Sequence, residues 1–192
     1  MRTPLEIHLL GPVEITHKNQ PLNIRRRIER VILYILAVEH QPVTRTKLID
    51  ILWPEAGQGD PRAALRTALS RLRNELPEPD LLITELDHAR LDIDRCEIDL
   101  LRFRNFYQSL QNILTAYQEN QTLPTQIVQQ IIEALNLWRG NDIIDGDNFS
   151  NYSRFESWRL SLNRELGQQR KFLMEKLIQH YQAAGCPELA LE

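Results

Sequence analysis

The chain has little cysteine, no long apolar run and no strong excess of either charge. Two of its 192 residues are cysteines, Cys96 and Cys186, and their wide separation indicates neither a disulfide framework nor a zinc site. No apolar run approaches the roughly 18 residues that a membrane-spanning helix needs. The first residues also lack the basic-then-apolar order of a signal peptide. We therefore expect a cytoplasmic protein that does not associate with membranes.

Motifs for catalysis or cofactor binding are also missing. The glycine-containing segment 57–59 (GQG) lacks the spacing and the lysine of a phosphate-binding loop, and no histidine spacing matches a metal site. The acidic segment 145–147 (DGD) begins a partial match to a calcium-binding loop. However, Phe149 and Ser150 stand where such a loop needs an oxygen ligand and a glycine. We expect an acidic connecting loop there, and a protein with no enzymatic activity, no cofactor and no metal.

The net charge of −3 conceals a difference between the two halves of the chain. Residues 1–95 hold 14 basic and 14 acidic residues, so residues 96–192 hold the remaining 9 of 23 basic and 12 of 26 acidic residues. A hydrophobic content of 42% over this length is enough for a sizeable core and for two small domains. Because neither half carries a net positive charge, any nucleic-acid surface must be a local basic patch, and we expect it in the first half.

Residues 60–76 are the most informative stretch. Asp60 is a favourable N-cap, and Pro61 suits the first position of a helix. Four leucines recur at helical spacing and predict one buried stripe: Leu65, Leu69, Leu72 and Leu76. The rest of the surface carries arginines and short hydrogen-bonding side chains: Arg62, Arg66, Thr67, Ser70, Arg71, Arg73 and Asn74. Arginine presents a fork of donors that matches guanine or phosphate, although a lone helix of this kind is also typical of an ordinary solvated surface.

The elements around this helix favour DNA binding. Short strands are predicted at 5–11, 13–16 and 22–24, followed by a helix that ends near His40. The arginines at 25–27 lead into that helix, where contact with phosphate and simple solvation are equally good interpretations.

A second helix, 45–53, begins at Thr44 and precedes the 60–76 helix in the order of a helix-turn-helix. The loop between the two is longer than a tight turn, which indicates a winged variant. The start of the 45–53 helix is a natural phosphate seat, formed by Thr44, Arg45 and Thr46. A hairpin predicted from 81–85 and 90–93 would be the wing, with His88 or Arg90 against the DNA backbone.

The second half reads as a string of amphipathic helices. Helical periodicity covers residues 99–117, and a second helix runs from about 125 to 138, with Gly140 as the residue that ends it. Two further helices are predicted at 155–166 and 170–184, closed by Gly185. Short connections favour stacked helical hairpins, although no clean 34-residue repeat is present.

These blocks resemble the Streptomyces antibiotic regulatory protein (SARP) family. The matching pieces of the first domain are LEIHLLGPVEI, LYILAVEHQPVTRTKLIDILWPE and AALRTALSRLRNEL. The second half is similar to that family's bacterial transcriptional activator domain through IDLLRFRNF, IIEALNLWRGNDIID and FESWRLSLNREL. The resemblance implies a mainly α protein with a small β component. It predicts a winged-helix DNA-binding domain at 1–95 and an all-α, tetratricopeptide-like domain at 96–192, which is expected to continue beyond this chain.

The same resemblance implies function and partners. It predicts a transcription regulator that binds double-stranded promoter DNA, as a homodimer on direct repeats, and activates by recruiting RNA polymerase. The loop 54–59 and the wing are the candidate polymerase contacts. The competing hypothesis is a protein-interaction scaffold that does not bind DNA, because a winged helix can keep its shape without that function.

Overall fold

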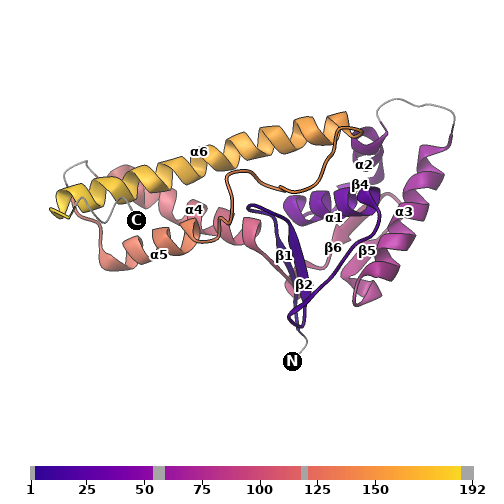
Figure 1. Ribbon diagram of the computed structural model, residues 1–192, viewed down its shortest axis with the longest axis horizontal. Coiled ribbons are helices and arrows are strands. Elements are labelled where there is room, and N and C mark those ends of the chain that lie inside the picture. Colours follow the sequence, from indigo (N-terminus) through magenta and orange to yellow (C-terminus); the bar gives the residue numbers. More distant parts are fainter. Residues whose placement is uncertain (1–2, 54–58, 118–120, 187–192) are drawn as a thin grey trace.

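The computed structural model describes residues 3–53, 59–117 and 121–186. The chain forms a mainly helical molecule with two small sheets, as Figure 1 shows. The predicted fold class, a winged helix followed by a helical domain, is confirmed. In the described ranges, no helix is both long and apolar enough to cross a membrane.

The first sheet joins the two ends of the N-terminal half. Its strand order is β3-β2-β1-β7, with β1 antiparallel to β2 and parallel to β7. These strands are β1 (Leu5–His8), β2 (Glu14–His17), β3 (Gln20–Pro21) and β7 (Cys96–Ile98). The predicted third strand is present but lies at 20–21 and not at 22–24. The turn takes only Lys18 and Asn19, both with positive φ, so Gln20 already pairs with His17.

The helix-turn-helix is built on α1 (Arg27–Glu39), whose residues 31–38 are all buried. Helices α2 (Arg45–Leu52) and α3 (Pro61–Glu75) pack against each other, and α3 also packs on α1. A second sheet contains the predicted hairpin and has the strand order β4-β6-β5. Its strands are β4 (Val43–Thr44), β5 (Leu82–Thr84) and β6 (His88–Leu91). Short 3₁₀ turns flank it: η1 (Pro79–Leu81) and η2 (Ile93–Arg95).

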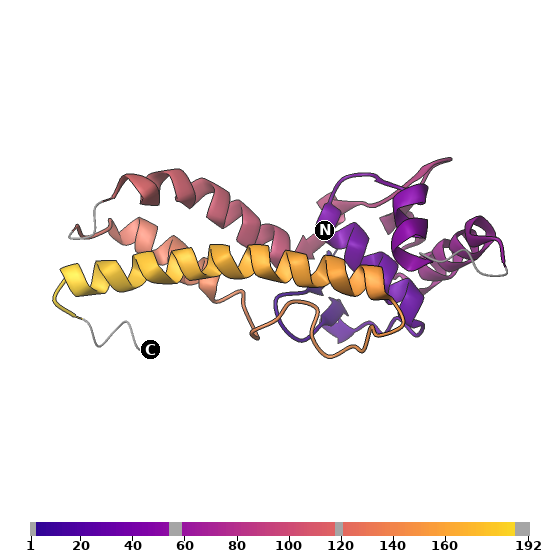
Figure 2. The same ribbon diagram turned by 90° about the horizontal axis from the view of Figure 1, so that it is seen from above.

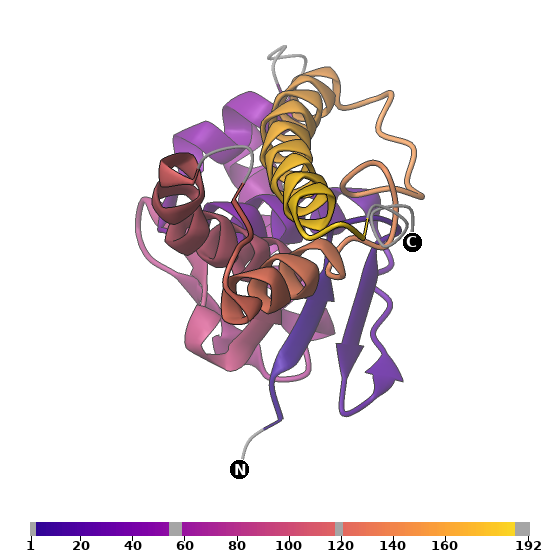
Figure 3. The same cartoon turned by 90° about the vertical axis from the view of Figure 1, so that its left-hand side faces the viewer.

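Three helices make up the rest: α4 (Asp99–Ala116), α5 (Thr125–Leu135) and α6 (Ser153–Ala183). Figure 3, which looks nearly along α6, shows the three helices grouped together. Phe103 and Leu110 of α4 and Leu173 of α6 are fully buried. Figure 2 shows α6 running along most of the molecule. Its 31 residues correct the prediction of two helices at 155–166 and 170–184. Gly167 costs an exposed helix only about 1 kcal/mol, which the buried Leu162, Leu166 and Leu173 on either side offset.

A segment between α5 and α6 ties the helical part to the first sheet. Helix α5 ends at Leu135, so Gly140 does not end it as predicted. Instead, Gly140 lies against the backbone of Gly11, whose φ is +129°. Backbone hydrogen bonds join Arg139 and Ile144 to the carbonyls that follow β1, at 2.7 and 2.8 Å. The predicted domain boundary between residues 95 and 96 therefore falls directly before β7, which pairs with β1, and this boundary stays a prediction.

Candidate nucleic-acid interface

Helix α3 begins and is anchored as its sequence predicts. The Asp60 carboxylate accepts a hydrogen bond from the Arg62 backbone N–H at 2.9 Å, and Pro61 occupies the first turn. The four predicted leucines are buried, together with Ala68. This stripe packs against α1 and α2, and it leaves the opposite face of the helix at the edge of the molecule (Figure 1).

The exposed face of α3 carries six of the seven polar residues predicted for it. The exposed side chains are Arg62, Arg66, Thr67, Ser70, Arg71 and Asn74. Among the described residues, none of the three arginines takes part in an ion pair. Thr67 bonds back to the Ala63 carbonyl of its own helix. The guanidinium groups are therefore available to an outside partner.

Arg73 differs from the other arginines of α3. Its side chain is half-buried, and Nη2 donates to the Leu82 carbonyl and to the Thr84 hydroxyl of β5. Its guanidinium is thus engaged in holding the hairpin to the C-terminal half of α3.

The start of α2 also meets the wing. The Thr44 hydroxyl caps α2 by accepting from the Lys47 N–H at 3.1 Å, and Thr46 is exposed beside it. Arg45 is half-buried: its N–H donates to the Asp87 carbonyl at 2.8 Å, and Nη2 donates to the Glu85 carbonyl at 3.0 Å. Two of the donors expected to seat a phosphate are therefore engaged by the turn of the hairpin.

The wing carries its predicted residues on its outer face. Ala89 and Leu91 of β6 are buried, so the alternating His88 and Arg90 point away from the core and are half-buried. His88 Nδ1 lies 2.7 Å from the Asp87 carboxylate. At the tip, Leu86 is 95% exposed. Sequence reasoning did not single out Leu86, although an apolar residue between two acidic residues in a predicted turn was the available signal.

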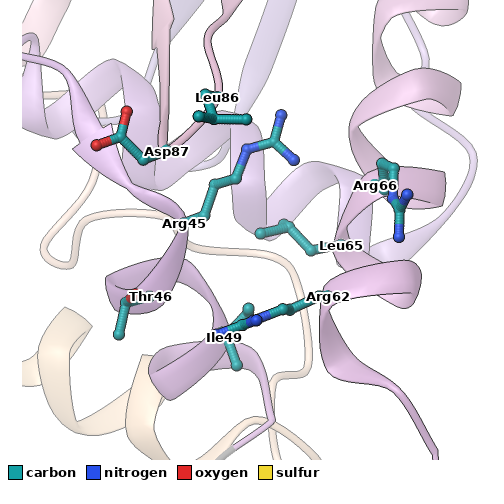
Figure 4. Close-up of a pocket in the computed structure, with 8 residues that line it drawn as sticks. All are labelled: Arg45, Thr46, Ile49, Arg62, Leu65, Arg66, Leu86 and Asp87. Atoms are coloured by element: carbon teal, nitrogen blue, oxygen red, sulfur yellow. The ribbon is translucent and has the colours of Figure 1, made fainter.

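The wing, α2 and α3 enclose a hollow of about 440 Å³, drawn in Figure 4. The guanidinium of Arg45 extends toward Leu86 across its upper part, while Arg62 and Arg66 reach it from α3. Its other lining residues are Thr46, Ile49, Leu65 and Asp87. Three cationic groups against one carboxylate make the hollow locally basic, in a half of the chain whose charges balance overall.

A second group of charges lies under the C-terminal half of α3. Glu29 of α1 is fully buried, and neither of its carboxylate oxygens has a hydrogen-bond partner among the described residues. Burial raises the pKa of Glu29, the nearby Glu75 carboxylate raises it further, and Arg26 and Arg71 act in the opposite direction. Of the arginines at 25–27, Arg25 and Arg26 are exposed, and the Arg25 N–H donates to the Glu75 carboxylate at 3.1 Å, so the start of α1 lies beside the end of α3.

The acidic loop before α6 is engaged in structural contacts. Asp147 accepts from Arg30 at 2.8 and 2.9 Å and from the Tyr34 hydroxyl at 3.3 Å. The Asp145 carboxylate accepts from the Gly146 N–H. Over the part of the chain that the structure describes, no group of three or more acidic, histidine or cysteine residues is arranged to hold a metal ion.

Comparison with known proteins identifies two sequence relatives of this chain. No family model matches the chain. It is 28% identical over 162 residues to the regulatory protein AfsR of Streptomyces griseus, covering 82% of this chain and 16% of AfsR. It is 30% identical over 149 residues to the transcriptional regulator RedD of Streptomyces coelicolor, covering 73% of this chain and 41% of RedD.

A solved structure matches the fold over nearly the whole chain. Mycobacterium tuberculosis EmbR, solved in complex with a low-affinity phosphopeptide, superposes with a TM-score of 0.69 at 22% identity, covering 99% of this chain and 57% of that one. This chain therefore spans less than two thirds of each of these relatives. AfsR and RedD are regulators of the Streptomyces antibiotic regulatory protein family, and the resemblance of this chain to that family is confirmed over most of its length.

Proposed function

We propose that the chain is a sequence-specific, DNA-binding transcription regulator that inserts α3 into the major groove. The observation that carries the proposal is the exposed face of α3, whose three arginines have no ion pair among the described residues and which lies beside a basic hollow and a hairpin. The major groove is wide enough for a helix. The two sequence relatives are transcriptional regulators, which supports the same role.

The residues of this surface then fall into three groups, which contact bases, contact the DNA backbone or support the wing. Arg62, Arg66 and Ser70 lie nearest the bases, where bidentate arginine contacts to guanine select sequence. A second group contacts the DNA backbone, which supplies affinity without reading sequence: Thr44, Thr46, Thr67, Arg71, Asn74, His88 and Arg90. Arg45 and Arg73 hold the wing against α2 and α3, because the structure shows their donors bonded to the hairpin.

The test begins with selection of a binding sequence from a pool of random-core duplexes. Fluorescence anisotropy then compares wild type and Arg66→Ala on the selected duplex and on a scrambled duplex. If Arg66 reads a base, the variant should lose about 1–3 kcal/mol on the selected duplex and almost nothing on the scrambled one. The matched control is Arg102→Ala, which removes an exposed arginine of α4 and should change neither affinity.

Other outcomes reassign the residue or remove the proposal. Equal weakening on both duplexes would assign Arg66 to a phosphate. No binding of wild type to any duplex, even at low salt, would instead favour a protein-interaction scaffold.

The proposal extends to partners. From the family resemblance, we infer activation by recruitment of RNA polymerase and binding as a homodimer on direct repeats. Of the candidate polymerase contacts, the wing turn with exposed Leu86 is described, whereas residues 54–58 lie outside the described residues. Such a regulator acts in the cytoplasm and needs no enzymatic activity or cofactor. Run-off transcription from a promoter carrying the selected sequence, with and without the protein, tests activation against repression.

A further inference from the structure

A second hollow lies where the start of α6 meets α2. Its volume is about 490 Å³, and its walls come from α2 and from the first turns of α6. Figure 1 shows the start of α6 beside α2, and the two helices are in contact. Thr44, Thr46 and Ser157 are among its lining residues, and Asp50 is the acidic residue among them.

Arg154 is the cation of this hollow with donors to spare. It lies in the first turn of α6 and is exposed, and its Nη1 donates to the Asp50 backbone carbonyl at 3.2 Å. Among the described residues, its remaining guanidinium nitrogens have no hydrogen-bond partner and no ion pair ties it to Asp50. The other cation, Lys47, is paired with Glu39 at 2.9 Å. The backbone bond thus ties the Arg154 guanidinium to α2 and leaves its other donors without a partner among the described residues.

The two hollows are neighbours along α2. Thr46 lines both of them, and Arg154 bonds to α2 four residues further on, which is about 6 Å along the helix axis. Because a DNA strand carries a phosphate for about every 3.4 Å of duplex axis, a strand that places one phosphate at Thr46 brings its neighbouring phosphates close to other cations of this region, of which Arg154 is one.

We propose that Arg154 contacts a DNA phosphate, so that the helical half of the chain takes part in binding the duplex. The inference rests on the proposed DNA-binding function and adds to it a contact from outside the winged helix. The contact is electrostatic and independent of sequence. It therefore adds to affinity on every duplex and leaves base preference unchanged.

The experiment measures Kd by anisotropy for the full 192-residue chain, on the selected duplex and on an unrelated duplex of about 30 base pairs. Arg154→Ala should weaken binding to both equally. The slope of log K against log salt, which is negative, should also become shallower by about 0.9, the value for one lost phosphate contact. From about 50 to 200 mM salt, the difference between variant and wild type should shrink about 3-fold.

Two matched variants separate a phosphate contact from other effects. Arg164→Ala removes an exposed arginine of the same helix, about 15 Å further along, and should leave affinity and slope unchanged. Arg154→Lys keeps the charge and should retain most of the slope, whereas a merely structural role for the guanidinium would make lysine behave like alanine.

The outcomes are distinguishable from those of the proposed function. If wild type binds the duplexes and Arg154→Ala keeps its affinity and slope, this inference is overturned and the regulator proposal stands. If Arg154→Lys is as weak as alanine, the phosphate contact is also overturned. If wild type binds no duplex, the proposed function fails first and the inference falls with it.

Discussion

Asp99 is the buried group on which the junction between the first sheet and the helical part depends. Only 4% exposed, it starts α4, and its carboxylate accepts from Leu9 N–H at 2.8 Å, Leu10 N–H at 3.0 Å and Leu100 N–H at 2.7 Å. Replacement by alanine leaves the Leu9 and Leu10 donors buried without an acceptor. Each such donor costs about 1–3 kcal/mol, so Asp99→Ala should lose about 2–6 kcal/mol of the unfolding free energy.

Asparagine gives a graded comparison at the same position. Its single oxygen can still accept from Leu9 and Leu100, but its NH₂ group faces the Leu10 donor. Asp99→Asn should therefore cost about 1–3 kcal/mol. Urea unfolding at pH 7, followed by circular dichroism, measures both variants. Asp94→Ala, which removes an exposed carboxylate nearby, is the control and should change the unfolding free energy by less than about 0.5 kcal/mol.

The pH dependence provides a second readout. Burial raises the pKa of Asp99, although its three backbone donors and His8 lower it in part. The folded protein then keeps this proton at pH values where the unfolded chain has lost it. Wild-type stability from this group therefore falls as the pH rises from about 4 through the raised pKa. Neither Asp99 variant should show that decline. An alanine variant as stable as wild type, or equal costs for alanine and asparagine, would refute the reasoning.

Two further substitutions test other parts of the fold. A Cβ at Gly11 would lie 2.7 Å from the Gly140 nitrogen, and the φ of +129° at Gly11 disfavours any other residue. Gly11→Ala should therefore cost about 1–3 kcal/mol of the unfolding free energy, and each kcal/mol should lower the thermal midpoint by about 2–4 °C. Gly167→Ala, with open space around it, should instead raise the midpoint slightly. Glu29→Gln should stabilise by about 1 kcal/mol at pH 8, because it removes an unpaired buried carboxylate. Because wild-type stability falls as the pH rises through the raised pKa of Glu29, the gain should be smaller at pH 5, and a gain equal at both values would contradict this account.

The sequence predicts elements whose signals are local. The Asp60 cap, Pro61 and the leucine stripe of α3 all lie within one stretch, so periodicity alone locates the buried and exposed faces. The Thr44 cap of α2 is confirmed for the same reason. The continuity of α6 is not encoded locally: Gly167 by itself disfavours a helix, and the burial of Leu162, Leu166 and Leu173 on either side of it decides that the helix continues.

Features that depend on distant partners were not predictable. Arg73 shares the arginine-rich side of α3 with Arg66, and helical geometry alone cannot distinguish the two. Their difference arises because the hairpin folds back onto the last turns of α3 and supplies acceptors to Arg73. Pairing of β7 with β1 joins residues about 90 positions apart, and no local pattern encodes that contact.

The junction between the first sheet and the helical part also affects which residues of the proposed complex supply affinity and which supply sequence specificity. The Asp99 contacts fix the start of α4, the Arg30–Asp147 ion pair fixes the segment that precedes α6, and the Asp50 carbonyl accepts from Arg154 itself. A side chain that is already ordered loses little rotamer entropy when it meets a phosphate. The exposed arginines of α3, by contrast, lose up to about 2 kcal/mol each when they are fixed. That cost is offset where a bidentate contact to the matching base forms, so the exposed arginines of α3 favour discrimination between sequences over uniform affinity.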